Sequence, residues 1–400
     1  MNTEKWIEKS DKYIMKTYGR YPIVPVRGKG CKLWDVDGKE YLDFLGGVAV
    51  NNLGHCHSNV VKAIQEQATT LIHCSNYYQI PQQIELAELL CSLSFADKAF
   101  FCNSGAEANE AAIKLARKYS RDKTGKSDRY GIITATDSFH GRTLATVSAT
   151  GQEKIQRFFD PLLHGFTHVA FDDVAAIEAA ITDDTCAVML EPIQGEGGVN
   201  VPSPGYLAGV RELCNKYGLL LILDEVQVGM GRTGKLFAYE HFGITPDIIT
   251  LAKALAGGVP IGAMLATDDV ATAFSPGTHG STFGGNPLAT AAALAAVRTI
   301  VEEGILNSAE EMGEYLVGEL ETLHKKYPVI IKEVRGIGLM IGMALTIPGG
   351  DIVKAGHERG VLLNTTHDTV LRFVPPLIVS KQEVNEMIRI LDGILKEITV

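Results

Sequence analysis

Two apolar runs lie in the middle of the chain, and each ends at charged side chains. Residues Leu219 to Leu223 are all apolar and stop at Asp224 and Glu225, while the mostly apolar run Ile248 to Ala252 stops at Lys253. Short apolar runs are typical of strands buried on both faces. Ligands bind at the carboxyl ends of strands in open α/β sheets, so we expect a carboxylate and an amine to meet there.

The pattern around these runs predicts strands that alternate with helices from about residue 100 onwards. A further short strand is expected to end at Phe100 and Phe101, and two more are expected at Tyr130–Ala135 and Cys186–Leu190. The helices expected in this part and just before it are Asn59–Leu71, Gln82–Ser92, a long helix that opens at Asn103–Asn109 and runs through Lys118, and Tyr206–Tyr217. Regular alternation of this kind predicts a mostly parallel sheet.

The two ends of the chain have a different pattern. Residues 3–17 are weakly helical, and residues 31–44 alternate around Asp37-Gly38, which is a hairpin signal. The elements expected after residue 290 are helices at Pro287–Glu303 and Ala309–Tyr327, strands at Val334–Ala344 and Leu371–Phe373, and a last helix that opens on a Ser380/Glu383 capping box. We therefore predict a large domain over residues 51–290 and a smaller α+β domain from residues 1–50 and 291–400.

Composition narrows the classes of function. The chain has 400 residues, of which 46% are hydrophobic, and a formal net charge of −10, which argues against a nucleic-acid or anionic-membrane surface. No apolar run reaches the length of a membrane span, and the polar N-terminus lacks the apolar region of a signal peptide. The seven cysteines are scattered without a CxxC motif, so we expect reduced thiols in a cytoplasmic protein.

A carboxylate and a lysine at neighbouring strand ends suit pyridoxal phosphate. This cofactor needs a lysine for a Schiff base and a carboxylate that keeps its pyridine nitrogen protonated, so that the ring can accept electrons. The lysine must lose its proton near neutral pH, which a desolvated pocket rich in cations favours. Taken singly, Asp224 could instead cap a helix and Lys253 could extend to solvent.

Other short motifs are weaker. Gly229, Gly231 and Gly234 spell GxGxxG, but five residues separate them from the end of the apolar run. The overlapping GxxxxGK lacks the Ser or Thr of a P-loop, because Leu236 stands there. His55-Cys56-His57 has no third ligand at helical or hairpin spacing, so no metal site is predicted.

At least five separated motifs, in the right order, resemble the class III aminotransferases of fold type I, and within them the acetylornithine aminotransferase group. Four of them read FCNSGAEANEAAIKLARKY, FHGRT, DEVQVGMGRTG and ITLAKALAGGVPIGA. The resemblance covers essentially the whole chain, with small departures at Ser58 and Val228. It implies an α/β fold with a mostly parallel seven-stranded sheet flanked by helices, a smaller α+β domain built from both termini, and pyridoxal 5′-phosphate as cofactor.

The resemblance also implies roles for individual residues. Lys253 would form the Schiff base, Asp224 would pair with the pyridine nitrogen, and Gln227 would lie near the ring hydroxyl. A strand, a small-residue loop and a helix N-terminus form an anion site, because free backbone N–H groups and the helix dipole face the ligand. The resemblance places the cofactor phosphate there. The other implied cofactor-binding residues are Ser104, Gly105, Ala106, Phe139 on the ring face, His140, and Thr282, which would reach the partner's cofactor phosphate.

For the substrate, the resemblance implies two arginine clamps for carboxylates, Arg142 and Arg372. Glu196 would be a mobile partner for the substrate-binding arginine, because glycines flank it. Tyr21 and Ser281 would complete the substrate site. The implied assembly is a homodimer with shared active sites that acts on small molecules.

The implied reaction is transamination between N2-acetyl-L-ornithine and 2-oxoglutarate, which gives N-acetyl-L-glutamate 5-semialdehyde and L-glutamate in arginine biosynthesis. Ornithine, succinylornithine, N-succinyl-diaminopimelate and 4-aminobutyrate remain alternative donors, because enzymes for all of them share the cofactor core. A related aminomutase and a regulatory protein that holds the cofactor without turnover are further alternatives.

Overall fold

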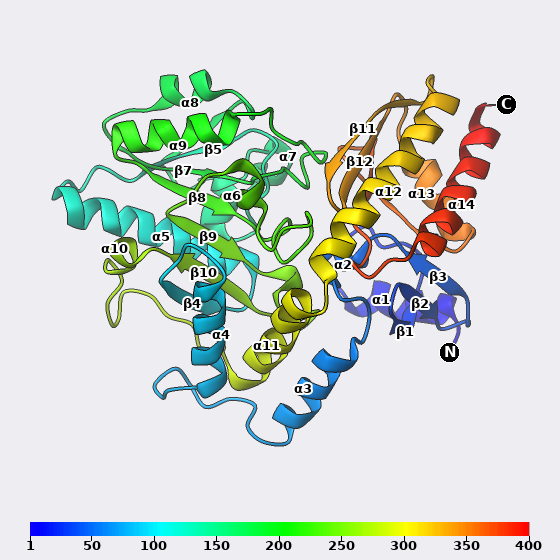
Figure 1. The fold of residues 1–400 in the computed structure, drawn as a ribbon, viewed down its shortest axis with the longest axis horizontal. Coiled ribbons are helices and arrows are strands. Elements are labelled where there is room, and N and C mark those ends of the chain that lie inside the picture. Colours follow the sequence, from blue (N-terminus) through cyan, green and yellow to red (C-terminus); the bar gives the residue numbers. More distant parts are fainter. Residues whose placement is uncertain (400) are drawn as a thin grey trace.

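The computed structural model describes residues 1–399 and has two unequal parts (Figure 1). The larger part contains a seven-stranded sheet with the order β4-β10-β9-β8-β7-β5-β6. Its strands are β4 (Lys98–Cys102), β5 (Gly131–Ala135), β6 (Phe166–Val169), β7 (Thr185–Leu190), β8 (Leu220–Asp224), β9 (Ile248–Leu251) and β10 (Gly262–Ala266). Strand β10 runs antiparallel to both of its neighbours, and the other pairs are parallel. The predicted mostly parallel sheet is confirmed.

Both faces of this sheet are apolar. Alternate residues of the central strands therefore pack into two separate hydrophobic cores, one on each face. Leu221 and Leu223 of β8 face one core, and Leu220 and Ile222 face the other. The first core is covered by α4 (Pro81–Ser92), α8 (Val174–Ala180) and α9 (Tyr206–Tyr217). The second core is covered by α5 (Gly105–Thr124), α6 (Leu144–Ala149) and α10 (Asp268–Ala271).

Four helices begin or end at residues other than the predicted ones. Helix α5 continues past Lys118 and ends only at Gly125, which adopts a left-handed φ of 69°. Helix α1 (Thr3–Tyr13) is shorter than predicted and buries none of its side chains, so no packing extends it. Helix α3 (Ser58–Ala68) also ends before the predicted Leu71, and α12 (Ile305–Lys326) begins earlier, directly after Gly304.

The smaller part brings both ends of the chain together. The predicted hairpin around Gly38 is confirmed, and its second strand pairs in parallel with β13 (Val361–Leu362). The side chain of Lys39 fastens the hairpin turn by donating to the carbonyl oxygens of His357 (2.9 Å) and Glu358 (2.8 Å). The first sheet has the order β1 (Pro25–Lys29), β2 (Lys32–Asp35), β3 (Glu40–Asp43) and β13 (Val361–Leu362). The exact domain boundaries stay a prediction.

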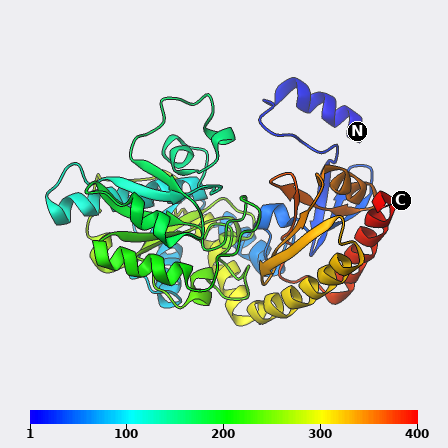
Figure 2. The same ribbon diagram turned by 90° about the horizontal axis from the view of Figure 1, so that it is seen from above.

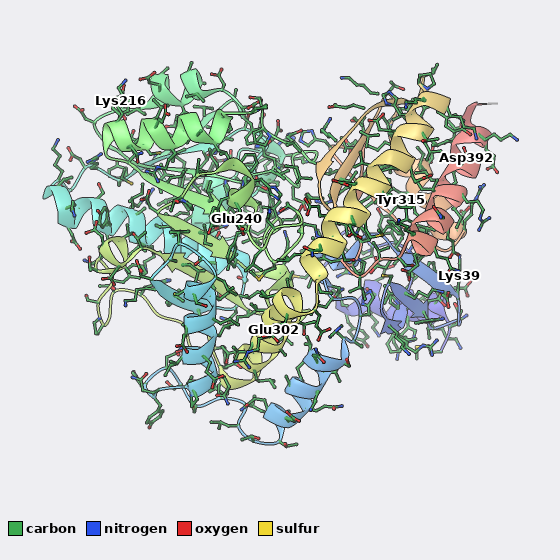
Figure 3. All side chains as sticks on the ribbon, in the orientation of Figure 1. Lys39, Lys216, Glu240, Glu302, Tyr315 and Asp392 are labelled. Carbon is green, nitrogen blue, oxygen red and sulfur yellow. The ribbon has the colours of Figure 1, made fainter. Side chains whose placement is uncertain are left out.

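The second small sheet follows the order β11 (Ile331–Ile337), β12 (Met340–Leu345), β15 (Val370–Phe373) and β14 (Asn364–Thr366). The predicted strand region 334–344 is thus a hairpin that turns at Gly338. Its outer helices are α12, α13 (Gly350–Glu358) and α14 (Lys381–Thr399), and the capping box of Ser380 and Glu383 is present. The outer contacts of α12 and α14 include Tyr315 with Asn385 and Lys326 with Asp392 (Figure 3).

Helix α11 (Pro287–Glu302) joins the two parts and packs on α3 and α4 (Figures 1 and 2). A buried arginine, Arg232, ties the parts together, because its guanidinium donates to the carbonyl oxygens of Leu339 (3.1 Å) and Pro375 (2.5 Å) and to the side chain of Asn52. The remaining short helices are α2 (Gly46–Ala49), α7 (Glu153–Gln156) and the 3₁₀ turns Ala238–Phe242 and Lys253–Ala256. Within residues 1–399, no helix is both long and apolar enough to cross a bilayer.

Candidate active site

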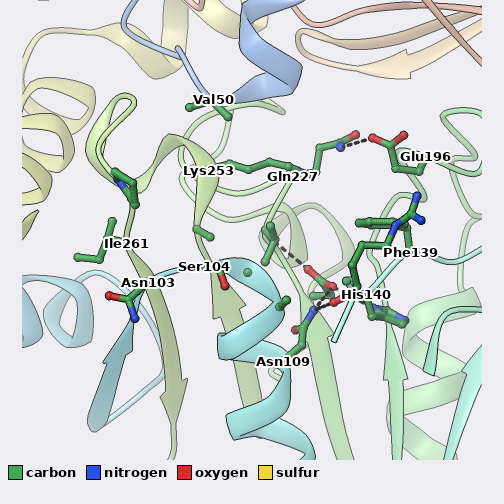
Figure 4. Close-up of a pocket in the computed structure, with 18 of the residues that line it drawn as sticks. Val50, Asn103, Ser104, Asn109, Phe139, His140, Glu196, Gln227, Lys253 and Ile261 are labelled. Atoms are coloured by element: carbon green, nitrogen blue, oxygen red, sulfur yellow. Dashed lines mark hydrogen bonds and ion pairs between the residues drawn. The ribbon is translucent and has the colours of Figure 1, made fainter. Parts of the chain in front are cut away.

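A cavity of about 390 Å³ opens at the carboxyl ends of the central strands, between the two parts of the chain (Figure 4). Asp224 closes β8 and Lys253 follows β9, so the strand-end acid and amine reach the same cavity. Lys253 has a φ of 43°, a left-handed conformation that is uncommon for a residue with a side chain. Backbone strain of this kind is concentrated at functional sites.

The surroundings of Lys253 favour its neutral amine. Burial lowers the pKa of Lys253, and this effect outweighs the nearby carboxylates of Glu196 and Asp224, which raise it. A neutral amine is a nucleophile and a base, whereas an ammonium group is neither. Lys253 is also the only lysine among the cavity's lining residues that the structure describes.

Asp224 is held by three donors. Its Oδ2 atom accepts from Asn109 Nδ2 at 2.7 Å and lies 2.9 Å from His140 Nδ1, while its Oδ1 atom accepts from the backbone N–H of Val226 at 3.0 Å. Burial alone would lower the pKa of His140. The hydrogen bond and the charge of Asp224 raise this pKa by more, so the net shift is upward. An orientated carboxylate can stabilise a cation, such as a protonated ring nitrogen, in the cavity.

The N-terminus of α5 forms an anion site on the cavity wall. Ser104 caps the helix by accepting from the backbone N–H of Glu107 (3.2 Å), and the Glu107 carboxylate accepts in return from the backbone N–H of Asn103 (2.5 Å). A Cβ at Gly105 would come within 2.7 Å of the Val226 side chain, so only glycine fits this approach. The geometry suits a phosphate, because the first N–H groups of a helix lack partners within it.

Glu196 and Gln227 also line the cavity, and Glu196 forms an ion pair with Arg372. The distance between Arg372 Nη1 and Glu196 Oε1 is 2.6 Å, and Gln227 contacts both groups at 3.0 and 3.2 Å. Burial raises the pKa of Glu196, but Arg372 and Lys253 lower it more strongly, to about 2. Arg372 is only 2% exposed, so its charge depends on this acid for neutralisation.

Phe139 and Arg142 come from the loop after β5. Both line the cavity, and the Arg142 guanidinium lies 5.5 Å from the centre of the Phe139 ring. Arg142 is exposed, and Figure 4 shows the Phe139 ring directed into the cavity. This wall can therefore supply an aromatic face and a cation for a carboxylate.

Four of the predicted residues are not among those that line this cavity in the single chain. One of them is Arg372, which contacts the lining residues Glu196 and Gln227. Thr282 is exposed beside a neighbouring hollow, and Ser281 accepts there from Asn103 Nδ2 at 3.2 Å. Tyr21 is exposed and packs edge-on against the ring of His357, with ring centres 4.3 Å apart. Their predicted roles stay predictions.

Glu191 and Asn109 are among the lining residues that the sequence had not assigned to the site. Glu191 accepts from the backbone N–H groups of Phe139 (3.0 Å) and Gly195 (3.4 Å), and burial raises its pKa to about 7. Its signal was the same as that of Asp224, an acid directly after a buried strand. Asn109 is a polar residue on the face of α5 that otherwise buries Ala108, Ala111 and Ala112.

Across residues 1–399, no cluster of three or more His, Cys, Asp or Glu side chains could hold a metal ion.

The family model for class-III aminotransferases matches residues 13–395. The chain belongs to this family. An acetylornithine aminotransferase of Methanocaldococcus jannaschii is 55% identical to this class-III aminotransferase over 399 residues, which cover 100% of both chains. The known family thus spans both parts of the fold and the cavity between them.

Solved structures of other class-III aminotransferases have the same fold. An ornithine aminotransferase from Toxoplasma gondii matches with a TM-score of 0.96 at 36% identity, covering 100% of this chain and 96% of that one. A second structure of that enzyme has PLP at partial occupancy in its active site. An acetylornithine aminotransferase from Elizabethkingia anophelis matches with a TM-score of 0.89 at 36% identity, covering 99% and 100% of the two chains.

Proposed function

We propose that this class-III aminotransferase uses pyridoxal phosphate to transfer an amino group between N2-acetyl-L-ornithine and 2-oxoglutarate, as in arginine biosynthesis. The observation that carries the proposal is the pair of arginines, of which Arg142 is exposed at the cavity and Arg372 is neutralised by Glu196. The full-length relative at 55% identity, named as an acetylornithine aminotransferase, supports the same donor.

The residues of the cavity fit the cofactor. The α5 N-terminus would hold its phosphate, Asp224 its ring nitrogen, and Phe139 one face of its ring. When bound, the cofactor supplies an electron-accepting ring that stabilises charge on the amine-bearing carbon. Lys253 would bind the cofactor covalently, and its freed amine would move a proton to and from that carbon. General acid–base transfer by one group of this kind contributes roughly 10²- to 10⁴-fold.

Glutamate has two carboxylates, and one of them is on the carbon that bears its reacting amine. Acetylornithine has no carboxylate at its reacting end. Acetylornithine reacts through its terminal amine and has one carboxylate far from that amine, which Arg142 would hold. Arg372 would then face no anion, and an unpaired buried charge costs several kcal/mol. Glu196 would pair with Arg372 during this half-reaction and release it when the α-carboxylate of glutamate arrives. Gly195 and Gly197 flank Glu196, and we expect them to allow this movement.

The donor is tested by comparing kcat/KM for acetylornithine, ornithine, succinylornithine, N-succinyl-diaminopimelate and 4-aminobutyrate with 2-oxoglutarate as acceptor. We expect acetylornithine to have the highest value. A higher value for another donor reassigns the substrate within the family, and ornithine is the alternative that the T. gondii structure favours. Cofactor binding without turnover of any donor would favour a regulatory protein instead.

Replacing Glu196 with alanine is expected to shift the balance of the two half-reactions towards glutamate. Arg372 would lose its partner at 2.6 Å and stay open to α-carboxylates. Single-turnover rates with glutamate and with acetylornithine should change relative to each other by about 1–3 kcal/mol, or roughly 5- to 150-fold. Glu178→Ala, which removes an exposed ion pair with Lys216, is the matched control. Equal losses in both half-reactions would show that Glu196 is structural.

The segment at Thr282 supports a further proposal, a homodimer with shared active sites. Thr282 and Phe283 are exposed beside the hollow at Ser281, and Tyr77 and Tyr78 are 95% and 69% exposed nearby in the fold. Large exposed apolar side chains of this kind mark interaction surfaces. An active monomer in sedimentation analysis would exclude this assembly.

All seven cysteines are unpaired, which supports a reducing compartment such as the cytoplasm.

A further inference from the structure

Asn109 contacts Asp224 and uses both of its amide donors and one acceptor site of its amide oxygen. Its Nδ2 atom donates to the carbonyl oxygen of His140 and to Asp224 Oδ2, both at 2.7 Å (Figure 4). Its Oδ1 atom accepts from the hydroxyl of Thr250, also at 2.7 Å. Asn109 is 1% exposed and Thr250 is fully buried, so water does not substitute for these partners.

These partners permit only one orientation of the amide. If the amide were flipped, Oδ1 would face two acceptors, the carboxylate of Asp224 and the carbonyl of His140, and each contact would become repulsive. The Thr250 hydroxyl has its only hydrogen bond to Asn109 among the residues described, so its proton is available for Oδ1. The two acceptors therefore select the orientation in which the NH₂ group faces Asp224, and the Thr250 hydroxyl donates to Oδ1 in that orientation.

The arrangement matters because Asn109 joins the elements that carry the groups of the cavity. Asn109 is on α5, five residues beyond the Ser104 cap, while Asp224 ends β8 and Thr250 lies on β9, three residues before Lys253. A neutral NH₂ donor stabilises an ionised carboxylate without neutralising it. Asn109 therefore adds no positive charge beside Asp224, whereas a lysine or arginine in its place would reduce the attraction of Asp224 for a protonated ring nitrogen.

We propose that Asn109, with its amide held in place by Thr250, is a positioning residue that keeps the Asp224 carboxylate aligned for the cofactor ring. This inference rests on the proposed use of pyridoxal phosphate and does not depend on which amine is the donor. Asn109 itself is not required to touch the substrate or the cofactor.

The test uses three single variants and one double variant of the full chain. Asn109→Leu has a similar shape and removes both donations, and Thr250→Val removes only the hydroxyl. Ser120→Ala is the control, because Ser120 is buried on the same helix but outside the cavity. Each apoprotein is titrated with pyridoxal phosphate by fluorescence, its melting temperature is measured, and kcat and KM are determined after loading.

For Asn109→Leu we expect the cofactor Kd to rise roughly 10-fold and kcat to fall roughly 10- to 100-fold, with the donor KM changed by less than about threefold. Thr250→Val should act in the same direction by roughly 3- to 10-fold. In the Asn109→Leu background, Thr250→Val should cost less than about twofold more, because it acts through the amide that is already absent. Ser120→Ala should leave Kd and kcat unchanged.

A purely structural role gives a different result. It predicts a lower melting temperature of the apoprotein with wild-type Kd and kcat, and that outcome overturns the proposal. A full effect of Thr250→Val on top of Asn109→Leu also overturns it. If Asn109→Leu does not fold, Thr250→Val decides alone, and wild-type Kd and kcat in that variant refute the inference. If the wild-type chain binds the cofactor but turns over no donor, the proposed reaction fails while the Kd measurements still test Asn109.

Discussion

Replacing Lys253 with alanine is expected to lower transamination by roughly 10⁴-fold or more, because one amine serves both as the covalent anchor and as the proton carrier. No other lysine that the structure describes lines the cavity, so no neighbour can substitute. Borohydride reduction of the loaded wild-type protein should fix the cofactor on the peptide that contains Lys253, as detected by mass spectrometry.

The matched control for this experiment is Lys235→Ala. Lys235 belongs to the same central stretch but is exposed and outside the cavity, so its replacement should leave turnover and the adduct unchanged. An adduct on any lysine other than Lys253 would refute the assignment.

The second large effect is expected for Asp224→Asn, with kcat lowered roughly 10²- to 10³-fold, a loss typical of removing one preorganised electrostatic contact. The neutral amide would remove the charge that keeps the ring nitrogen protonated. It would also set an NH₂ group against donors, because Asp224 accepts from Asn109, Val226 and His140. The measurements are kcat for both half-reactions and the cofactor Kd of the apoprotein.

The control for Asp224 is its neighbour, in the form of Glu225→Gln. Glu225 accepts from the backbone N–H groups of Ala238 and Tyr239, both at 2.7 Å, and burial raises its pKa to about 8. It lies outside the cavity lining, so we expect a change in stability rather than in turnover. Wild-type kcat in Asp224→Asn together with lost activity in Glu225→Gln would exchange the two assignments.

The sequence predicted best those strands in which every residue is buried. The runs that became β7, β8 and β9 are buried on both faces, so their apolar pattern is continuous. Strand β6 was missed because it lies at the sheet edge, where only a half-buried pattern is needed. Strand β10 was missed because its sequence GAMLA is as typical of a helix as of a strand.

Contacts between distant residues could not be predicted from spacing alone. Arg372 and Glu196 are 176 residues apart in sequence, and only the resemblance to the family brought them together before the structure did. The contacts of Asn109 with Asp224 and Thr250 also join three separate elements. In a helix rich in alanine, a single asparagine has no spacing pattern that reveals its partners.

The pairing of β3 with β13 has a consequence for synthesis of the chain. Strand β3 ends at Asp43, whereas its partner begins at Val361, so roughly 320 residues of chain separate them. At translation rates of about 5–20 residues per second, β3 leaves the ribosome tens of seconds before its partner exists. During that interval its edge is open to pairing with other nascent chains. The parallel core strands β7, β8 and β9 are complete much earlier, so the sheet that bears Asp224 can fold before the N-terminal hairpin finds its place.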